Sequence, residues 1–366
     1  MKKTAYACAI ACLGGLATHG AMAQSSVTIY GLLDSGVVYT NNANAAGNSV
    51  VKVPGLTGSL PSRIGFRGVE DLGGGLQAVF TLESGINVDT GTMGQGNRLF
   101  GRQASVGLKG AFGTLTLGRQ INMTFLSSLK SDVMGPNLFS MSSIDGYIPN
   151  ARSDNAIGYL GNFSDFTVGA TYSFGRDASA AGGPAATACA GEVAGNSKAC
   201  RQVTGLLGYD NKRLGVTASY DIMYGNTGAA AGLTTSDSSD RRTTLNAYAM
   251  AGELRVGTGV MARKKDAATP VNDLESNLYY LGASYPLMPM LTLDAQVARH
   301  DVKNSDNDST LTAVRLTYFL SKRTAVYSSL GRMKNSGVAA ISLDAGGTVG
   351  QGLSQSGVSA GVRHTF

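Results

Sequence analysis

Apolar and polar residues alternate with a period of two through nearly the whole chain, and no helical stripe interrupts the pattern beyond the first 23 residues. A period of two places successive side chains on opposite faces of a β-strand. The pattern predicts an all-β protein of sixteen strands, at residues 26–40, 62–70, 76–87, 98–109, 113–120, 155–160, 166–174, 202–210, 214–224, 241–251, 254–265, 275–285, 291–302, 309–320, 324–335 and 355–366.

The connections between these strands alternate between two lengths. Tight turns such as 71–75 ("DLGGG") and 211–213 ("NKR") interleave with long polar loops such as 225–240 ("GNTGAAAGLTTSDSSD"). A soluble sandwich gives no reason for so regular an alternation. An even-numbered membrane barrel does, because its short turns lie at one rim and its long loops at the other. We therefore expect a 16-stranded antiparallel transmembrane β-barrel.

The apolar face of each strand is expected to point outward, toward lipid. Sixteen strands enclose a lumen too wide for side chains to fill, so a polar inner face would hold water whereas an apolar one would line an empty cavity. Only 15% of the residues are charged, against about a quarter in ordinary soluble proteins. The terminal stretch "SGVSAGVRHTF" also alternates and ends on an aromatic residue, Phe366.

Residues 1–23 have the features of a secretory signal peptide. Lys2 and Lys3 precede an apolar run at 6–16, and Ala21-Met22-Ala23 supplies the small residues that a signal peptidase recognises. Cleavage after Ala23 would leave residues 24–366 as a single barrel. The net charge, +6 for the whole chain, falls by two to +4 when the signal is removed.

Cys189 and Cys200 remain in the exported part of the chain, with ten residues between them in a Gly/Ala-rich loop. In an oxidising compartment the simplest expectation is one disulfide that closes this loop. Two free thiols are an alternative, and a metal pair is another, although no histidine is nearby.

The segment 121–154 differs from the other long loops, because apolar residues recur along it, among them Phe125, Met134, Phe139 and Ile148. A loop of this composition is expected to pack against another surface rather than to extend into water. Inside a barrel the available surface is the inner wall. We expect this third loop to fold inward and to narrow the lumen.

Four stretches resemble the general diffusion porins of Gram-negative outer membranes, especially the betaproteobacterial branch: "SSVTIYGLLDSGVVY", "SRIGFRGVEDLGGGLQAVFTLESG", "RLFGRQASVGLKGAFGTLTLGRQ" and "VSAGVRHTF". The resemblance implies a homotrimer in contact with outer-membrane lipid and lipopolysaccharide. It also implies a channel for small hydrophilic solutes and ions. Phe366 would then be the signal that the outer-membrane assembly machinery recognises.

The same resemblance implies a constriction in which wall arginines face acids on the third loop. Matching "SRIGF", "GRQASVGLK" and "NARSDN" assigns the arginines to Arg63, Arg102 and Arg152, and the loop acids to Asp132 and Asp145. Strand alternation agrees for Arg63 and Arg152. It disagrees for Arg102, which shares parity with the outward residues of its strand, so Arg102 rests on the resemblance alone.

Alternation also predicts charged side chains along the lumen wall. Arg67, Asp34 and Glu83 are expected there, and further inward candidates are Arg255, Arg263, Arg315, Arg363, Asp221 and Asp294. The wall therefore has more basic than acidic groups. Opposed charges across a narrow aqueous gap orient dipolar solutes, and the net sign selects ions. We expect passive diffusion with a weak to moderate preference for anions.

We expect no enzymatic activity, no cofactor, no resident metal and no nucleic-acid partner. "GGGLQA" at 73–78 fits a loose dinucleotide-binding pattern but opens a strand rather than a helix, so the required context is missing. Only His300 and His364 remain after the signal, and no serine nucleophile motif accompanies either. A barrel protease or phospholipase would need such a cluster at one rim.

Overall fold

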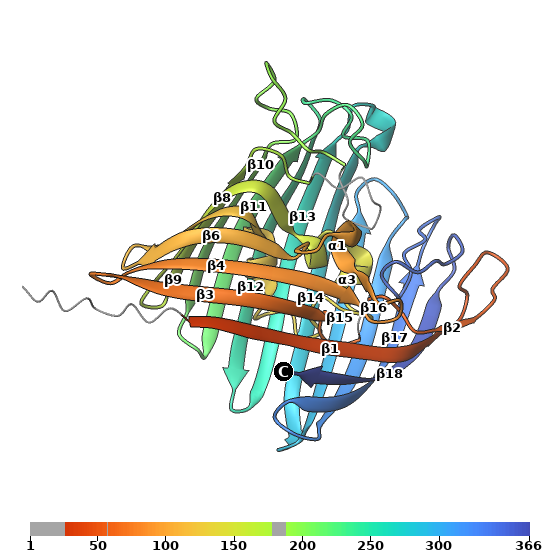
Figure 1. Ribbon diagram of the computed structural model, residues 1–366. Helices are drawn as coiled ribbons and strands as arrows, with labels where there is room; N and C mark the ends of the chain where they lie inside the picture. The colour runs from red at the N-terminus through yellow and green to blue at the C-terminus, as the bar shows by residue number, and fades with distance from the viewer. Residues whose placement is uncertain (1–25, 57, 178–187) are drawn as a thin grey trace, which may run out of the picture.

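A computed structural model describes residues 26–56, 58–177 and 188–366, and in it the chain forms one antiparallel β-barrel (Figure 1). The expected fold class is confirmed. The sixteen long strands are β1 Ser26–Thr40, β3 Arg63–Gly73, β4 Leu76–Asn87, β6 Gln103–Gly110, β7 Gly113–Ile121, β8 Arg152–Phe163, β9 Phe166–Ser173, β10 Gln202–Asp210, β11 Leu214–Tyr224, β12 Ser239–Ala251, β13 Leu254–Asp266, β14 Leu274–Met288, β15 Leu291–Val302, β16 Ser309–Phe319, β17 Thr324–Asn335 and β18 Gln355–Thr365. Two short strands, β2 Val50–Lys52 and β5 Thr92–Met93, lie in loops.

The barrel closes through β1, which pairs with a different strand along each half of its length. Its first half, from Ser26 to Leu32, pairs with β3, and its second half, from Leu32 to Thr40, pairs with β18. Phe366 continues this seam beyond β18, since its backbone exchanges two hydrogen bonds with Gly31 (3.0 and 3.2 Å). Each long strand thus has two paired neighbours, so the sheet closes on itself, as a sheet surrounded by lipid requires.

The side chains of the strands are distributed inside out relative to a soluble barrel. On β11, Ser219 and Asp221 point inward and are buried, whereas Val216 and Tyr220 on the opposite face are exposed. Leu207 on β10 is 65% exposed on the outer face, next to the buried inward residues of the same strand. This is the polarity expected of a wide barrel with a polar interior and an apolar outer surface.

One part of the inner wall is apolar, which differs from the continuous polar lumen that alternation suggests. Met261 on β13, Leu278 on β14, Leu311 on β16 and Met333 on β17 point inward and are buried. They pack against the apolar residues of the third loop in one cluster. The wall is apolar here because an apolar loop packs against it. The contact removes the apolar surface of the wall and of the loop from water.

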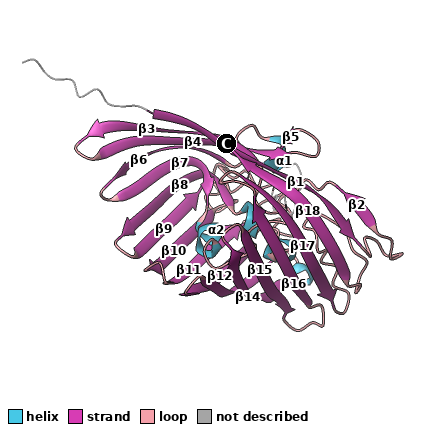
Figure 2. Ribbon diagram, turned by 90° about the horizontal axis from the view of Figure 1, so that it is seen from below, coloured by secondary structure: helices cyan, strands magenta, loops and turns pink. Residues whose placement is uncertain are grey.

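The helices are short and lie in the loops: α1 Gly94–Asn97, α2 Met123–Ser128, α3 Met141–Ile144, η1 Ile148–Asn150 and η2 Pro270–Asn272. None of the helices in the described ranges is long and apolar enough to cross a membrane. Figure 2 shows α2 within the ring of strands. Three of these helices, α2, α3 and η1, belong to the third loop, which the structure places at residues 122–151 and which we call loop 3.

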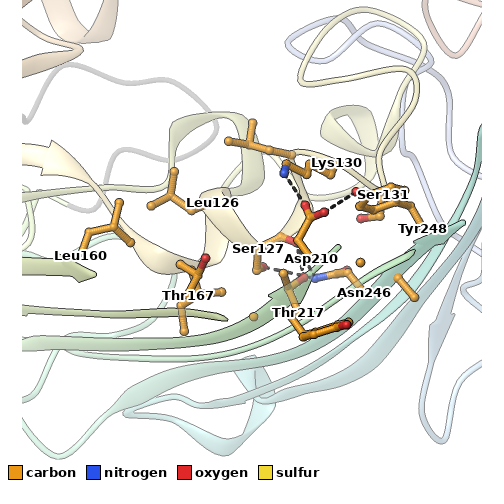
Figure 3. Close-up of a pocket in the computed structure, with 16 residues that line it drawn as sticks. Leu126, Ser127, Lys130, Ser131, Leu160, Thr167, Asp210, Thr217, Asn246 and Tyr248 are labelled. Carbon is orange, nitrogen blue, oxygen red and sulfur yellow. Dashed lines mark hydrogen bonds and ion pairs between the residues drawn. The ribbon is translucent and has the colours of Figure 1, made fainter. Parts of the chain in front are cut away.

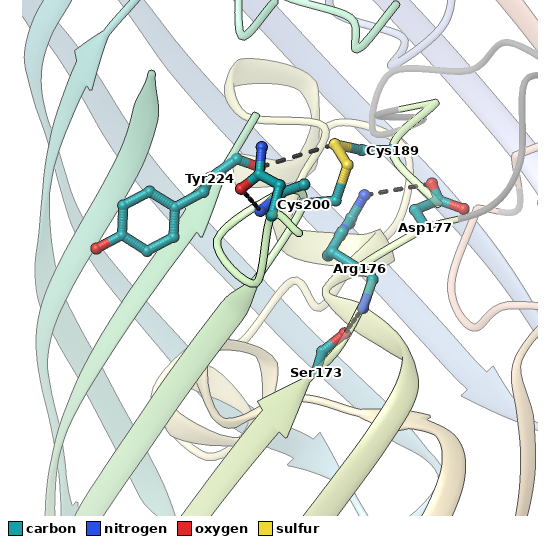
Figure 4. Close-up of a disulfide and its surroundings, with 9 residues drawn as sticks. Ser173, Arg176, Asp177, Cys189, Cys200 and Tyr224 are labelled. Atoms are coloured by element: carbon teal, nitrogen blue, oxygen red, sulfur yellow. Dashed lines mark hydrogen bonds and ion pairs between the residues drawn. A yellow bond between two sulfur atoms is a disulfide. The ribbon is translucent and has the colours of Figure 1, made fainter. Parts of the chain in front are cut away.

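Cys189 and Cys200 are joined by a disulfide with a Cα–Cα distance of 5.2 Å. Figure 4 shows this disulfide and its surroundings. Both cysteines are buried beside Ala229 and Leu233 of the next long loop. The backbone of Cys189 pairs with Asp177, and the Cys200 amide donates to the Gly225 carbonyl (3.0 Å). The disulfide therefore closes the loop after β9, and the Cys200–Gly225 hydrogen bond attaches that loop to the loop after β11.

We predict that a thiol-alkylating reagent adds no mass to the folded, exported protein until a reductant is present. After reduction it should add two labels, because Cys189 and Cys200 are the only cysteines beyond the signal segment. Intact-mass spectrometry gives the answer directly. Labelling of either cysteine without reductant would contradict the disulfide.

Candidate functional site

Loop 3 enters the barrel along β9 to β12, where hydrogen bonds attach α2 to inward-facing wall residues. The Thr124 hydroxyl donates to Asp221 (2.8 Å), and the Met123 amide donates to the Thr204 hydroxyl (3.3 Å). The Thr217 hydroxyl donates to the Ser127 carbonyl (2.6 Å). The side chain of Asn122 accepts from the Phe125 amide and so caps the helix. The polar residues that alternation places on the inner wall therefore hold the loop in place by hydrogen bonds.

The middle of loop 3 crosses to β14, β15 and β16. Ser131 and Tyr280 share a hydrogen bond between their hydroxyls (2.6 Å), and Gln296 donates to Asp132 (2.8 Å). Arg315 donates to the carbonyls of Met134 (2.9 Å) and Val133 (3.2 Å), while Asp294 neutralises its guanidinium (2.9 Å). Arg315 is thus a structural clamp on the loop backbone.

The apolar tip of loop 3 packs against the inner face of the wall between β13 and β17. Phe139 is completely buried there, and the last long loop, which we call loop 8 (residues 336–354), also folds inward over it. Leu343 of loop 8 is buried in the same cluster, and its carbonyl accepts from Ser143 (2.6 Å). The sequence analysis missed this second inward loop. The sequence signal is weak, because the apolar residues Ile341 and Leu343 stand in a stretch rich in glycine, alanine and serine.

Tyr147 anchors the returning part of loop 3. Its hydroxyl donates to Asp221 and accepts from Gln202 (2.6 Å). Its ring is flanked by the guanidinium groups of Arg176 (5.0 Å) and Arg242 (4.2 Å from the ring centroid), a cation–π arrangement. Asp221 therefore holds both the entry and the exit of the loop.

The three arginines expected at a constriction do come together, on the strands next to this exit. Glu83 accepts from the Arg102 Nε (2.7 Å) and from the Tyr30 hydroxyl (3.0 Å), and it lies 3.5 Å from the Arg63 Nε. Arg152 is buried beside them and donates its Nε to the Arg102 carbonyl (3.0 Å). We call Arg63, Glu83, Arg102 and Arg152 the arginine cluster.

Arg102 joins the cluster because it does not lie in a strand. Alternation predicts that this strand begins at residue 98, but β6 begins at Gln103, and Arg102 occupies the bend before it. Its amide donates to the Glu83 carbonyl (3.0 Å), which turns the side chain toward Glu83. Strand alternation therefore does not apply to Arg102, so its parity with the outward residues of the strand does not prevent it from pointing inward.

The loop acids do not face the arginine cluster. Asp132 accepts from Gln296 and from the amides of Met134 (3.2 Å) and Gly135 (3.1 Å), so it shapes a turn of loop 3. Burial raises the pKa of Asp132, although these hydrogen bonds oppose the change. The acid that Arg63 and Arg102 share is instead Glu83, which was expected only on the general lumen wall.

Asp145 faces a second basic group, on β12 and β13. Its carboxylate lies 3.0 Å from the Arg242 Nε and 3.9 Å from an Arg263 nitrogen. Burial would raise the pKa of Asp145, but Arg242 and then Arg263 outweigh it and hold that pKa well below its usual range. Asp240 also pairs with both arginines (3.2 and 2.7 Å). The sequence analysis did not select Arg242 or Asp240, although both share the inward parity of β12.

Asp34 and Arg67 were both expected on the lumen wall, and their environments differ. Asp34 is buried and accepts from the Ser59 and Leu60 amides (3.0 and 2.8 Å) and from the Tyr327 hydroxyl (2.6 Å). It therefore fastens the first long loop to the wall and presents no free charge to water. Arg67 is exposed and lies over the Tyr30 ring (5.4 Å).

Two open cavities adjoin loop 3. One, of about 190 Å³, is lined by Arg102, Pro149, Asn150, Gln95 and loop 8 residues. The other, of about 230 Å³, is lined by Arg255, Arg315, Arg363 and Asp132. Within the described ranges, no three His, Cys, Asp or Glu side chains are grouped so as to hold a metal ion. A transmembrane barrel narrowed by an inserted loop and lined by arginines belongs to the class of aqueous channels.

The chain belongs to the Gram-negative porin family, which matches residues 7–338. It is 34% identical to "Outer membrane porin protein 32" of Delftia acidovorans over the full length of both chains. It is 37% identical to an outer membrane porin protein of Bordetella pertussis, over 63% of this chain and 62% of that one. The structure of "Anion-selective porin from Comamonas acidovorans" is 28% identical, with a TM-score of 0.73, and the match covers 94% of this chain and all of that one. The protein is thus an outer-membrane porin.

We predict that Gly257→Ala displaces loop 3 from the wall and lowers single-channel conductance. A Cβ at Gly257 would lie 1.9 Å from the Ser131 carbonyl oxygen, so the loop backbone must move into the lumen. Such overpacking costs about 1–3 kcal/mol. Gly205→Ala is the matched control, because nothing lies within 4 Å of a Cβ there. A conductance equal to that of the unmodified protein would contradict the close packing of loop 3 against Gly257.

A second prediction follows from the depressed pKa of Asp145. Because the ionised carboxylate stabilises the docked loop, its contribution should be complete above the unfolded value of about 3.9 and lost only as the pH falls further. The difference in melting temperature between the unmodified protein and Asp145→Asn should therefore be constant from pH 8 to about 5 and shrink below about pH 4. A difference that already shrinks above pH 5 would be the opposite result.

Proposed function

We propose that the protein forms a water-filled channel for passive diffusion of small hydrophilic solutes and ions, with a preference for anions. The observation that carries the proposal is the arginine cluster, in which three guanidinium groups lie together with one carboxylate, that of Glu83, which pairs with Arg63 and Arg102. The printed description of the Comamonas relative as an anion-selective porin supports the same sign.

The second basic cavity extends this preference along the lumen. Arg255, Arg315 and Arg363 line it, and Asp294 neutralises only Arg315 directly. A field set between low-dielectric walls is screened less than one on an open surface. In addition to the arginine cluster, an anion therefore meets a second positive region beside loop 3.

The proposal includes the processing and assembly of the chain. Residues 1–23, which lie outside the described residues, act as a removable signal peptide, and residues 24–366 form the mature barrel. Three copies assemble through the exposed apolar outer face, and lipid and lipopolysaccharide surround the trimer. Phe366 is 44% exposed at the seam between β18 and β1, where assembly machinery has access to it.

The proposal is tested by planar-bilayer recording of the purified protein in a KCl gradient. We expect conductance in groups of three steps and a reversal potential of anion-selective sign. Cation-selective sign would overturn the anion preference, and absence of stepwise conductance would overturn the channel itself.

Glu83→Gln should make the channel more anion-selective. The change leaves the three arginines in place and removes the carboxylate that pairs with Arg63 and Arg102. We expect the chloride to potassium permeability ratio to rise about two- to fivefold, since one charge a few ångströms away changes an ion's energy by ~1 kcal/mol in water. Glu70→Gln is the matched control, because Glu70 is exposed on the outward parity of β3. An unchanged ratio in Glu83→Gln would show that the arginine cluster does not govern selectivity.

A further inference from the structure

A third cavity, of about 190 Å³, lies between the end of α2 and the inner wall at β8 to β12. Four leucines contribute to its lining: Leu126, Leu129, Leu160 and Leu206. Leu129 is 48% exposed in the lumen, where water would otherwise surround it. An apolar pocket on the wall of an aqueous channel is unusual, since the neighbouring wall is lined by serine, threonine and asparagine.

The volume of this cavity suits a small ring. A leucine-lined cavity of about 150 Å³ holds benzene in an engineered protein. The cavity here is somewhat larger, and its open side faces the lumen beside Leu129 and Lys130. A ring bound there would cover the exposed part of Leu129. This contact is favourable because it removes apolar surface of both the ring and the leucine from water.

One end of the cavity is polar and holds the ion pair of Lys130 and Asp210. Figure 3 shows Lys130 and Tyr248 directed at the Asp210 carboxylate, with Leu126 and Leu160 away from it. Asp210 accepts from the Tyr248 hydroxyl (2.6 Å), the Lys212 amide (2.7 Å) and Lys130, so its oxygens are satisfied. The Lys130 side chain remains 68% exposed and keeps donors for another acceptor.

The basic cavity of about 230 Å³ adjoins the apolar one, because Leu129 lines both. Within the described part of the chain, the Arg255 guanidinium forms no hydrogen bond or ion pair, and the Arg363 guanidinium donates only to the Ser59 hydroxyl (3.1 Å). A carboxylate attached to a ring in the apolar cavity is therefore adjacent to guanidinium groups with free donors. Charge-assisted hydrogen bonds of this kind are stronger than neutral ones.

We propose that these two cavities together form a binding site for aromatic carboxylates. The ring occupies the leucine-lined cavity, and the carboxylate faces Lys130 and Arg255. The site rests on the proposed function, since it gives an anion channel a preferred class of organic anion. Acetate carries the same charge without the ring and gains nothing from the leucines.

The test is a planar-bilayer recording at constant KCl with sodium benzoate or sodium acetate added. Benzoate should interrupt the current in a concentration-dependent manner, and acetate at the same concentration should not. Leu129→Asn should raise the half-blocking benzoate concentration at least about fivefold, as expected when one apolar contact is lost. Leu206→Thr, on the wall itself, is a second variant that leaves loop 3 unchanged.

Arg255→Gln should weaken the benzoate block, whereas Arg332→Gln should not. Both changes remove one positive charge, but Arg332 lies on the exposed face of β17, opposite the buried Met333. Val271→Asn, at an 85% exposed site in another loop, is the control for Leu129→Asn.

Three results would overturn the proposal: block by acetate equal to that by benzoate, no block by either anion, or benzoate block unchanged in Leu129→Asn, Leu206→Thr and Arg255→Gln. An anion-selective channel without benzoate block would leave the proposed function standing, and a cation-selective channel with benzoate block would overturn the anion preference alone.

Discussion

The docking of loop 3 against the inner wall is the interaction on which the rest of the channel depends. A barrel of sixteen strands satisfies its backbone groups by closure, but closure alone leaves a wide and featureless lumen. Loop 3 converts that lumen into a defined passage by two kinds of contact. Hydrogen bonds to Asp221, Gln296 and Arg315 fix its polar parts, and Phe139 buries its tip between β13 and β17.

Each kind of contact changes the inner wall, either in its polar lining or in the charges that remain free. Burying Phe139 requires inward-facing apolar residues such as Leu311 and Met333, which interrupt the polar lining. Fixing the loop with charged groups uses Asp221 and Arg315 as structural residues and so removes them from the set of charges that a passing ion meets. The charges left for ions are those that loop 3 does not occupy, above all Arg63, Arg102 and Arg255, since Arg152 donates to the Pro149 carbonyl of the loop.

The fold could be predicted from the sequence because the bilayer imposes a period of two on every strand, and because short turns and long loops alternate around the barrel. The constriction could be predicted only in part. Arg63 lies in a strand, so alternation gives its direction, but Arg102 lies in a bend whose geometry depends on its bond to Glu83. The partners of Asp132 and Asp145 depend on the path of loop 3. Gln296 and Arg242 are more than 90 residues away from these acids in sequence, and no local pattern connects them.

The same path explains why an apolar cavity can exist on the wall of a water-filled channel. The end of α2 lies beside β8 to β12 with its polar residues, such as Ser127, bonded to the wall, so the leucines of the same turn point elsewhere. Leu126 and Leu129 meet Leu206 and leave a space that loop 3 does not fill. Because Leu129 also borders the basic cavity, an apolar surface and free guanidinium donors lie side by side in the path of solutes. A channel built in this way distinguishes organic anions by their apolar part as well as by their charge.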